Sequence, residues 1–216
     1  MSTDQKEKFE KKFNRELNFL KNKGRLVDDW INVFNHCFTE GLVASVLGEL
    51  LGFKEKDQDM LIIAAILHDW FKRNEREAVN KYGAEEYNKK AKESSQFLKE
   101  AGYYDDVILL TESVGHSSLS NILGKDFIYQ VMHYIDDITF GNAVVSLDER
   151  IDELESAERY RELNESGKKL FNGKTYFQVQ REVGHIIENE IAKRLKVSPE
   201  MIVSLIKRKL KELFNI

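Results

Sequence analysis

The sequence contains little cysteine and no long hydrophobic run, and each scarcity excludes a class of protein. Its single cysteine, Cys37, excludes an intramolecular disulfide and a cysteine-based zinc site, and it suits a reducing cytosol. The longest apolar run covers residues 60–67, far fewer than the roughly 20 residues that span a bilayer. The polar segment 1–8 lacks the apolar core of a signal peptide. We therefore expect a cytoplasmic protein with no membrane partner.

Strand signals and strong net charge are also scarce. Proline occurs once, at Pro199, and no segment shows a convincing alternation of polar and apolar residues as a half-buried strand does. A 3.6-residue period dominates instead, which predicts an all-α fold. Hydrophobic residues make up 42% of the chain and charged residues 32%, so a core can form beneath a charged surface. The formal net charge of −4 makes nucleic acid an unfavourable partner, because phosphate binding requires clustered Lys and Arg.

The length of the chain predicts one domain. With 216 residues, the chain lies in the size range of a single helical domain, residues 1–216. We expect a body over about residues 28–140 and a C-terminal helical extension over about residues 145–216. The glycine-containing segment 164–174 is expected to be the loop that joins the last helices to this body.

Turn and cap residues divide the chain into expected helices. Gly52 is a typical C-terminal stop, Asp57 is the expected N-cap of the next helix, and Ser198 before Pro199 opens the last one. The expected helices cover residues 9–24, 28–51, 57–69, 84–101, 105–114, 126–140, 146–170, 175–195 and 198 onward.

Four polar residues stand in apolar, helix-like surroundings: His36, His68, Asp69 and Asp136. His36 lies in an apolar stretch, the His68-Asp69 doublet ends the longest apolar run, and isoleucines flank the Asp136-Asp137 pair. A lone histidine on an apolar helix is more often a hydrogen-bonded core residue than a ligand. Imidazoles and carboxylates delivered from separate helices to one point, however, are what a divalent metal requires, because the ion accepts their lone pairs and compensates their buried charge. The ensemble therefore predicts a metal site.

The order His36, His68-Asp69, Asp136 resembles the signature of the HD-domain superfamily of metal-dependent phosphohydrolases. The resemblance spans about residues 33–138 and implies an HD-domain helical bundle with additional C-terminal helices. It implies that His36, His68, Asp69 and Asp136 bind the metal. Asp136 is preferred to Asp137 because the family places an apolar residue two positions after the ligand, here Ile138. Two imidazoles and two carboxylates suit Mn²⁺, Co²⁺, Fe²⁺, Ni²⁺ or Zn²⁺.

Three residues are candidates for catalysis beside the metal. Asp69 could contact both the ion and the attacking water. Lys72 completes His68-Asp69-Trp70-Phe71-Lys72, which is similar to the His-Asp-x-x-Lys of many hydrolytic relatives, and its ammonium would neutralise a phosphate oxygen. The alternative for Lys72 is a lysine that only complements a helix C-terminus. His116 either faces the pocket and contacts a phosphoryl oxygen or is a loop histidine without a role.

The predicted function is hydrolysis of a small phosphate ester, with a nucleotide as the expected substrate class. A non-catalytic module that binds metal and nucleotide is the main alternative. A third hypothesis is a di-iron oxygenase of the same superfamily, which needs His116 and His133 as further ligands. The sequence leaves a homodimer open.

Overall fold

The computed structural model describes residues 2–23, 30–71, 84–115 and 118–216. Most of this part of the chain is helical and almost none of it is strand, which confirms the predicted all-α class. Its strands are a single antiparallel pair of two residues each, β1 (Thr139–Phe140) and β2 (Ala143–Val144). In these described ranges, no helix combines the length and the apolar character that crossing a membrane requires.

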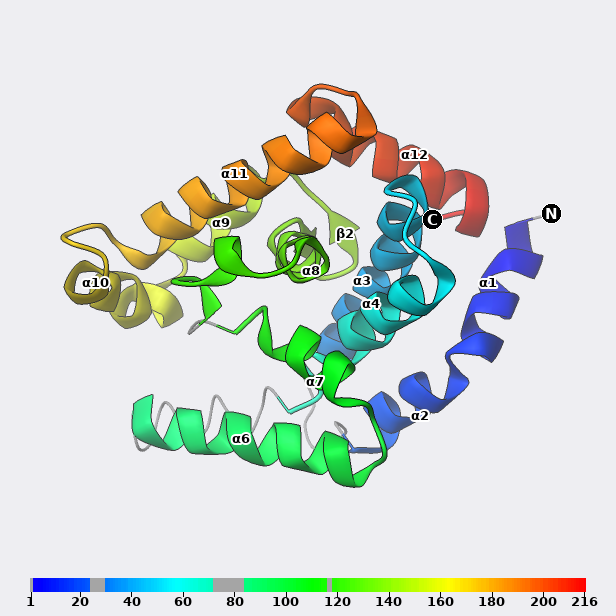
Figure 1. Cartoon of the computed structure of the whole chain (residues 1–216), viewed down its shortest axis with the longest axis horizontal. Helices are drawn as coiled ribbons and strands as arrows, with labels where there is room; N and C mark the ends of the chain where they lie inside the picture. The colour runs from blue at the N-terminus through cyan, green and yellow to red at the C-terminus, as the bar shows by residue number, and fades with distance from the viewer. Residues whose placement is uncertain (1, 24–29, 72–83, 116–117) are drawn as a thin grey trace.

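The helices follow one another in the order shown by the colours of Figure 1. They are α1 (Ser2–Lys12), α2 (Asn14–Lys23), α3 (Trp30–Leu50), α4 (Glu55–Leu67), α6 (Ala84–Glu100), α7 (Asp105–Glu112), η2 (Ile122–Gly124), α8 (Phe127–Asp137), α9 (Leu147–Ser156), η3 (Glu158–Tyr160), α10 (Arg161–Leu170), α11 (Tyr176–Leu195), η4 (Pro199–Met201) and α12 (Ile202–Phe214).

The core is built around α3 and α4, which pack along each other (Figure 1). Gly52, with φ of +70°, ends the turn after α3 and lets α4 return along it. Gly41 permits the close approach of the two helices, because a Cβ there would lie 2.8 Å from Cγ1 of Ile66. The apolar residues of both helices are mostly buried, as expected for helices at the centre of a domain. Their polar side chains in the middle of this pair therefore lie away from water.

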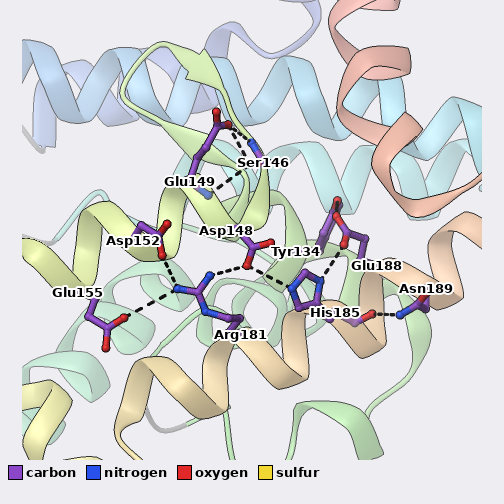
Figure 2. Close-up of polar contacts among 10 residues, drawn as sticks. All are labelled: Tyr134, Ser146, Asp148, Glu149, Asp152, Glu155, Arg181, His185, Glu188 and Asn189. Carbon is purple, nitrogen blue, oxygen red and sulfur yellow. Dashed lines mark hydrogen bonds and ion pairs between the residues drawn. The ribbon is translucent and has the colours of Figure 1, made fainter.

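The C-terminal helices hold α8 in place through polar contacts as well as packing. Figure 2 shows Arg181 and His185 of α11 reaching Asp148 of α9. His185 also contacts Glu188, and the hydroxyl of Tyr134 on α8 donates a hydrogen bond of 2.7 Å to Glu188. These contacts fix α8 against α9 and α11.

The predicted single helix over residues 146–170 is wrong, and the predicted loop over 164–174 is confirmed only for residues 171–174, which connect α10 to α11. The helix is broken at Ala157, whose extended backbone (φ −80°, ψ 114°) separates α9 from η3 and α10. α10 then continues to Leu170, with Gly167 inside it. A Cβ on Gly167 would lie 2.1 Å from the backbone nitrogen of Tyr176, so this glycine permits close packing on the start of α11 instead of forming a loop.

Of two predicted helix starts, the one at Asp57 is wrong and the one at Ser198 is confirmed in part, since Ser198 is at the N-cap position and Pro199 at the first helical position. Asp57 is not an N-cap: α4 begins at Glu55 after Lys54, and Asp57 lies in the first turn, where a carboxylate complements the helix dipole. Ser198 does precede Pro199, but its side chain makes no capping hydrogen bond, and the first turn there is a 3₁₀ helix. Side-chain caps are found instead at Ser146 and Thr175.

Candidate metal centre

Three helices bring the residues of the candidate metal centre together. His36 projects from α3, His68 directly follows α4 with Asp69 next to it, and Asp136 lies in the last turn of α8. The histidines and Asp69 are nearly buried, with exposed side-chain fractions of 9%, 1% and 11%, whereas that of Asp136 is 27%. The site is therefore closed on the side of α3 and α4 and most accessible beside Asp136.

The distances between donor atoms test whether these side chains fit a shared ion. Oδ1 of Asp136 lies 3.3 Å from Nε2 of His36 and 3.8 Å from Nε2 of His68. The Asp69 carboxylate lies 3.9 Å from Nε2 of His36 and 3.6 Å from Nε2 of His68. Atoms bound about 2.1 Å from one ion lie about 3.0 Å apart at adjacent positions and about 4.2 Å apart at opposite ones. All four distances fall in this range, so these side chains could share one divalent ion.

The sequence reasoning missed Glu40, which lies one helical turn after His36 on the same face of α3. Its Oε1 lies 3.0 Å from Nε2 of His36, and its Oε2 lies 3.1 Å from Nδ1 of His68. Its exposed fraction is 0%. The signal was present in the sequence, because an acid four residues after His36 interrupts an apolar stretch that otherwise continues to Leu47.

The surroundings of the Glu40 carboxyl oppose its ionisation. Burial is the largest effect and raises the pKa of Glu40, and the negative charge of Asp136 acts in the same direction. His68 and His36 act in the opposite direction. A carboxylate at such a position stays ionised only when a cation compensates it.

His36, Glu40, His68 and Asp136 form a group whose candidate donor atoms all lie within 4.8 Å of one another. Among the residues that the structure describes, no other three or more His, Cys, Asp or Glu side chains bring their donor atoms this close together. This group could hold a divalent metal. Asp69 is not one of its members, but its carboxylate lies 3.9 Å from Nε2 of His36 and 3.6 Å from Nε2 of His68.

The hydrogen bonding of His68 presents the correct ring nitrogen to the centre. Its Nδ1 lies 2.9 Å from the carbonyl oxygen of Ala65, an acceptor only, so Nδ1 carries the hydrogen. Nε2 then has a lone pair and faces Asp69 and Asp136. A metal-binding histidine commonly donates its other N–H to a carbonyl or carboxylate in this way.

Asp137 and His133 face away from the group. Oδ1 of Asp137 accepts a hydrogen bond from Gln180 of α11, and Oδ2 lies 3.5 Å from Nε2 of His133. Nδ1 of His133 lies 3.0 Å from the carbonyl oxygen of Ser113. Burial raises the pKa of Asp137 to about 6. The geometry thus favours Asp136 over Asp137 as the ligand from this pair.

Two of the predicted catalytic residues, Lys72 and His116, lie outside the described residues. Comparison of the chain with protein-family models, with curated proteins and with solved structures gave no match. The resemblance to the HD-domain superfamily therefore depends on the residues of this chain alone.

Proposed function

We propose that this protein is a metal-dependent phosphohydrolase that acts on a nucleotide or a related small phosphate ester. The observation that carries the proposal is the meeting of His36, His68, Asp69 and Asp136 at distances suited to one ion. These are the ligands that the resemblance to the HD-domain superfamily implies, and they come from separated segments of the chain.

The donor set limits which metal ions suit the centre. Two imidazoles with carboxylates suit Mn²⁺, Co²⁺, Fe²⁺, Ni²⁺ or Zn²⁺, whereas Ca²⁺ sites are built from oxygen ligands. When bound, such an ion supplies Lewis acidity for a phosphoryl oxygen and makes hydroxide available near neutral pH.

The chain's own residues would position the substrate and the attacking water. Asp136 is the most exposed member of the centre, so a phosphate ester would approach from its side. Asp69 contacts both histidines, and its carboxylate would orient the attacking water. Lys72 and His116 are proposed, from the sequence, to contact the phosphoryl oxygens. A cationic or hydrogen-donating group there stabilises charge that grows in the transition state.

A non-catalytic module that binds metal and nucleotide is the alternative that shares this geometry. The di-iron hypothesis has less support, because it requires His133 as a ligand and His133 faces Ser113 and Asp137. His116, its other required ligand, is outside the described residues.

A substrate screen tests the proposal. Metal-stripped protein receives one divalent metal at a time and is assayed with phosphomonoesters, nucleotides and cyclic diesters. We expect phosphate release or diester opening that requires added metal and is lost in Asp69→Ala. Saturable nucleotide binding without turnover under any metal would select the non-catalytic alternative. Turnover that is the same in metal-stripped protein would contradict the proposal.

A further inference from the structure

We infer that Glu40 is a further ligand of the proposed metal centre and contributes Oε1 beside His36, His68, Asp69 and Asp136. This inference rests on the proposed centre, but it needs metal binding only and not hydrolysis. The donor atoms of Glu40, His36, His68 and Asp136 lie within 4.8 Å of one another. With Asp69 as proposed above, the donor set would be two nitrogens and three oxygens, which suits an octahedral ion with one position left for water or substrate.

The burial of Glu40 is the first argument. The side chain is fully buried, and neither oxygen accepts a hydrogen bond from a backbone amide, hydroxyl, lysine or arginine of the described residues. A carboxylate without such partners costs several kcal/mol to place in a protein interior unless a cation compensates it. The groups that face it are the imidazoles of His36 and His68.

The position of Oε1 is the second argument. Oε1 lies 3.0 Å from Nε2 of His36, a distance explained either by a hydrogen on Nε2 or by an ion bound to both atoms. Nε2 is also the nitrogen that lies 3.3 Å from Asp136, so it is the nitrogen offered to the ion. An ion bound at Nε2 excludes a hydrogen there, and Oε1 then occupies an adjacent ligand position.

The role of Oε2 is different. It lies 3.1 Å from Nδ1 of His68, whose hydrogen is directed to the Ala65 carbonyl. Oε2 therefore faces the far nitrogen of a ligand ring, and Oε1 is the oxygen left for the ion. The closeness of α4 that Gly41 permits is what brings His68 within reach of Glu40.

A site with five protein donors should favour six-coordinate ions over four-coordinate ones. Four-coordinate tetrahedral geometry, common for Zn²⁺, does not use all five, whereas Mn²⁺ and Co²⁺ readily accept six ligands. Loss of Glu40 should weaken the binding of Mn²⁺ more than the binding of Zn²⁺. A residue with a purely structural role would weaken both equally.

The test compares Glu40→Gln with the unmodified full chain by calorimetric titration with Mn²⁺ and with Zn²⁺. We expect Glu40→Gln to bind Mn²⁺ at least about 10-fold more weakly, with a smaller change for Zn²⁺. The visible absorption of bound Co²⁺ should also rise, because the loss of a ligand lowers its coordination number. The burial-matched control is Glu16→Gln, a buried acid of α2 outside the centre, which should leave both affinities unchanged.

Thermal unfolding provides a second readout. The gain in Tm that Mn²⁺ confers should be smaller for Glu40→Gln than for the unmodified protein, because one ligand of the ion has been lost. If Glu40→Gln does not fold, Glu40→Asp keeps the charge but withdraws the oxygen, and it should show the same weakened Mn²⁺ binding. Unchanged affinities and an unchanged Co²⁺ spectrum would overturn the role of Glu40 and leave the centre standing. Absence of metal binding by the unmodified protein would overturn both.

Discussion

Asp136 and Asp137 are neighbours in the sequence, yet their carboxylates lie in different environments. Oδ1 of Asp136 lies 3.3 Å from Nε2 of His36 in the candidate metal centre. Asp137 is buried at 2% exposure and accepts a hydrogen bond from Gln180. Successive residues on a helix are about 100° apart, so only one of the pair can face α3 and α4.

The pair offers two isosteric variants that separate metal binding from structure. Asp136→Asn should lower affinity for Mn²⁺ at least about 10-fold, because a ligand with negative charge is lost. Asp137→Asn should leave this affinity unchanged, because its amide can still accept from Gln180 and donate toward His133. Equilibrium dialysis with metal analysis measures both. Equal losses in the two variants would contradict the assignment of Asp136 as the ligand.

The buried acid Glu16 predicts a pH dependence of stability. Burial raises the pKa of Glu16 above its ordinary value of 4.5, although its own backbone amide and Arg15 act in the opposite direction. The folded state thus binds the proton more tightly than the unfolded state, and Glu16 costs stability increasingly as pH rises from the unfolded pKa through the folded one. Glu16→Gln should therefore be more stable than the unmodified protein at neutral pH and equal to it at pH 4 or below. Urea unfolding across this pH range measures the difference in free energy of unfolding between the two proteins. A difference that does not change with pH would contradict the prediction.

The contact between Arg181 and Asp148 predicts a pH dependence of stability in the opposite direction. Partial burial alone would raise the pKa of Asp148, but the hydrogen bond from Arg181 and the charge of His185 lower it (Figure 2). Asp148 therefore contributes stability above its unfolded pKa of 3.8 that is lost as pH falls through the folded pKa. Because these groups are partly exposed, Arg181→Leu should cost only about 0.5–1 kcal/mol in the free energy of unfolding at neutral pH. The loss should shrink in acid and in high salt; a loss independent of both would show that packing, not charge, is involved.

The position of Gly167 predicts that adding one methyl group there destabilises the folded protein. A Cβ at this position would lie 2.1 Å from the backbone nitrogen and 2.6 Å from Cα of Tyr176, and backbone cannot rotate away as a side chain can. Gly167→Ala should lower the free energy of unfolding by about 1–3 kcal/mol. The matched control is Gly124→Ala in η2, where a Cβ would have no neighbour within 4 Å. Chemical denaturation measures both, and equal stability of the two variants would contradict the close packing of α10 on α11.

Periodicity and apolar patterning were enough to predict the fold class, the helices that carry His36 and Asp136, and the helix that His68 follows. The errors in helix and loop bounds occurred mainly where contacts between distant residues determine the local structure. Ala157 carries no sequence signal for a break, and Gly167 looks like a loop residue because its reason for being glycine is contact with Tyr176, nine residues later. Asp57 is of a residue type typical of N-caps, but α4 begins at Glu55, so Asp57 lies within its first turn.

Glu40 is the residue of the site that the sequence pattern did not identify. Its position one turn after His36 was visible in the sequence, but its contact with His68 depends on the packing of α4 against α3. Pattern reasoning selected the residues that resemble a known signature and passed over an acid whose importance is spatial.

Equilibrium dialysis of the metal-stripped full chain against Mn²⁺, followed by metal analysis, tests the central claim most directly. We expect one ion per chain, with binding at least about 10-fold weaker in His68→Ala. Circular dichroism of that variant checks that it remains helical. Failure of the unmodified protein to bind Mn²⁺, Co²⁺, Fe²⁺, Ni²⁺ or Zn²⁺, or equal binding by a folded His68→Ala, would contradict the existence of the metal centre.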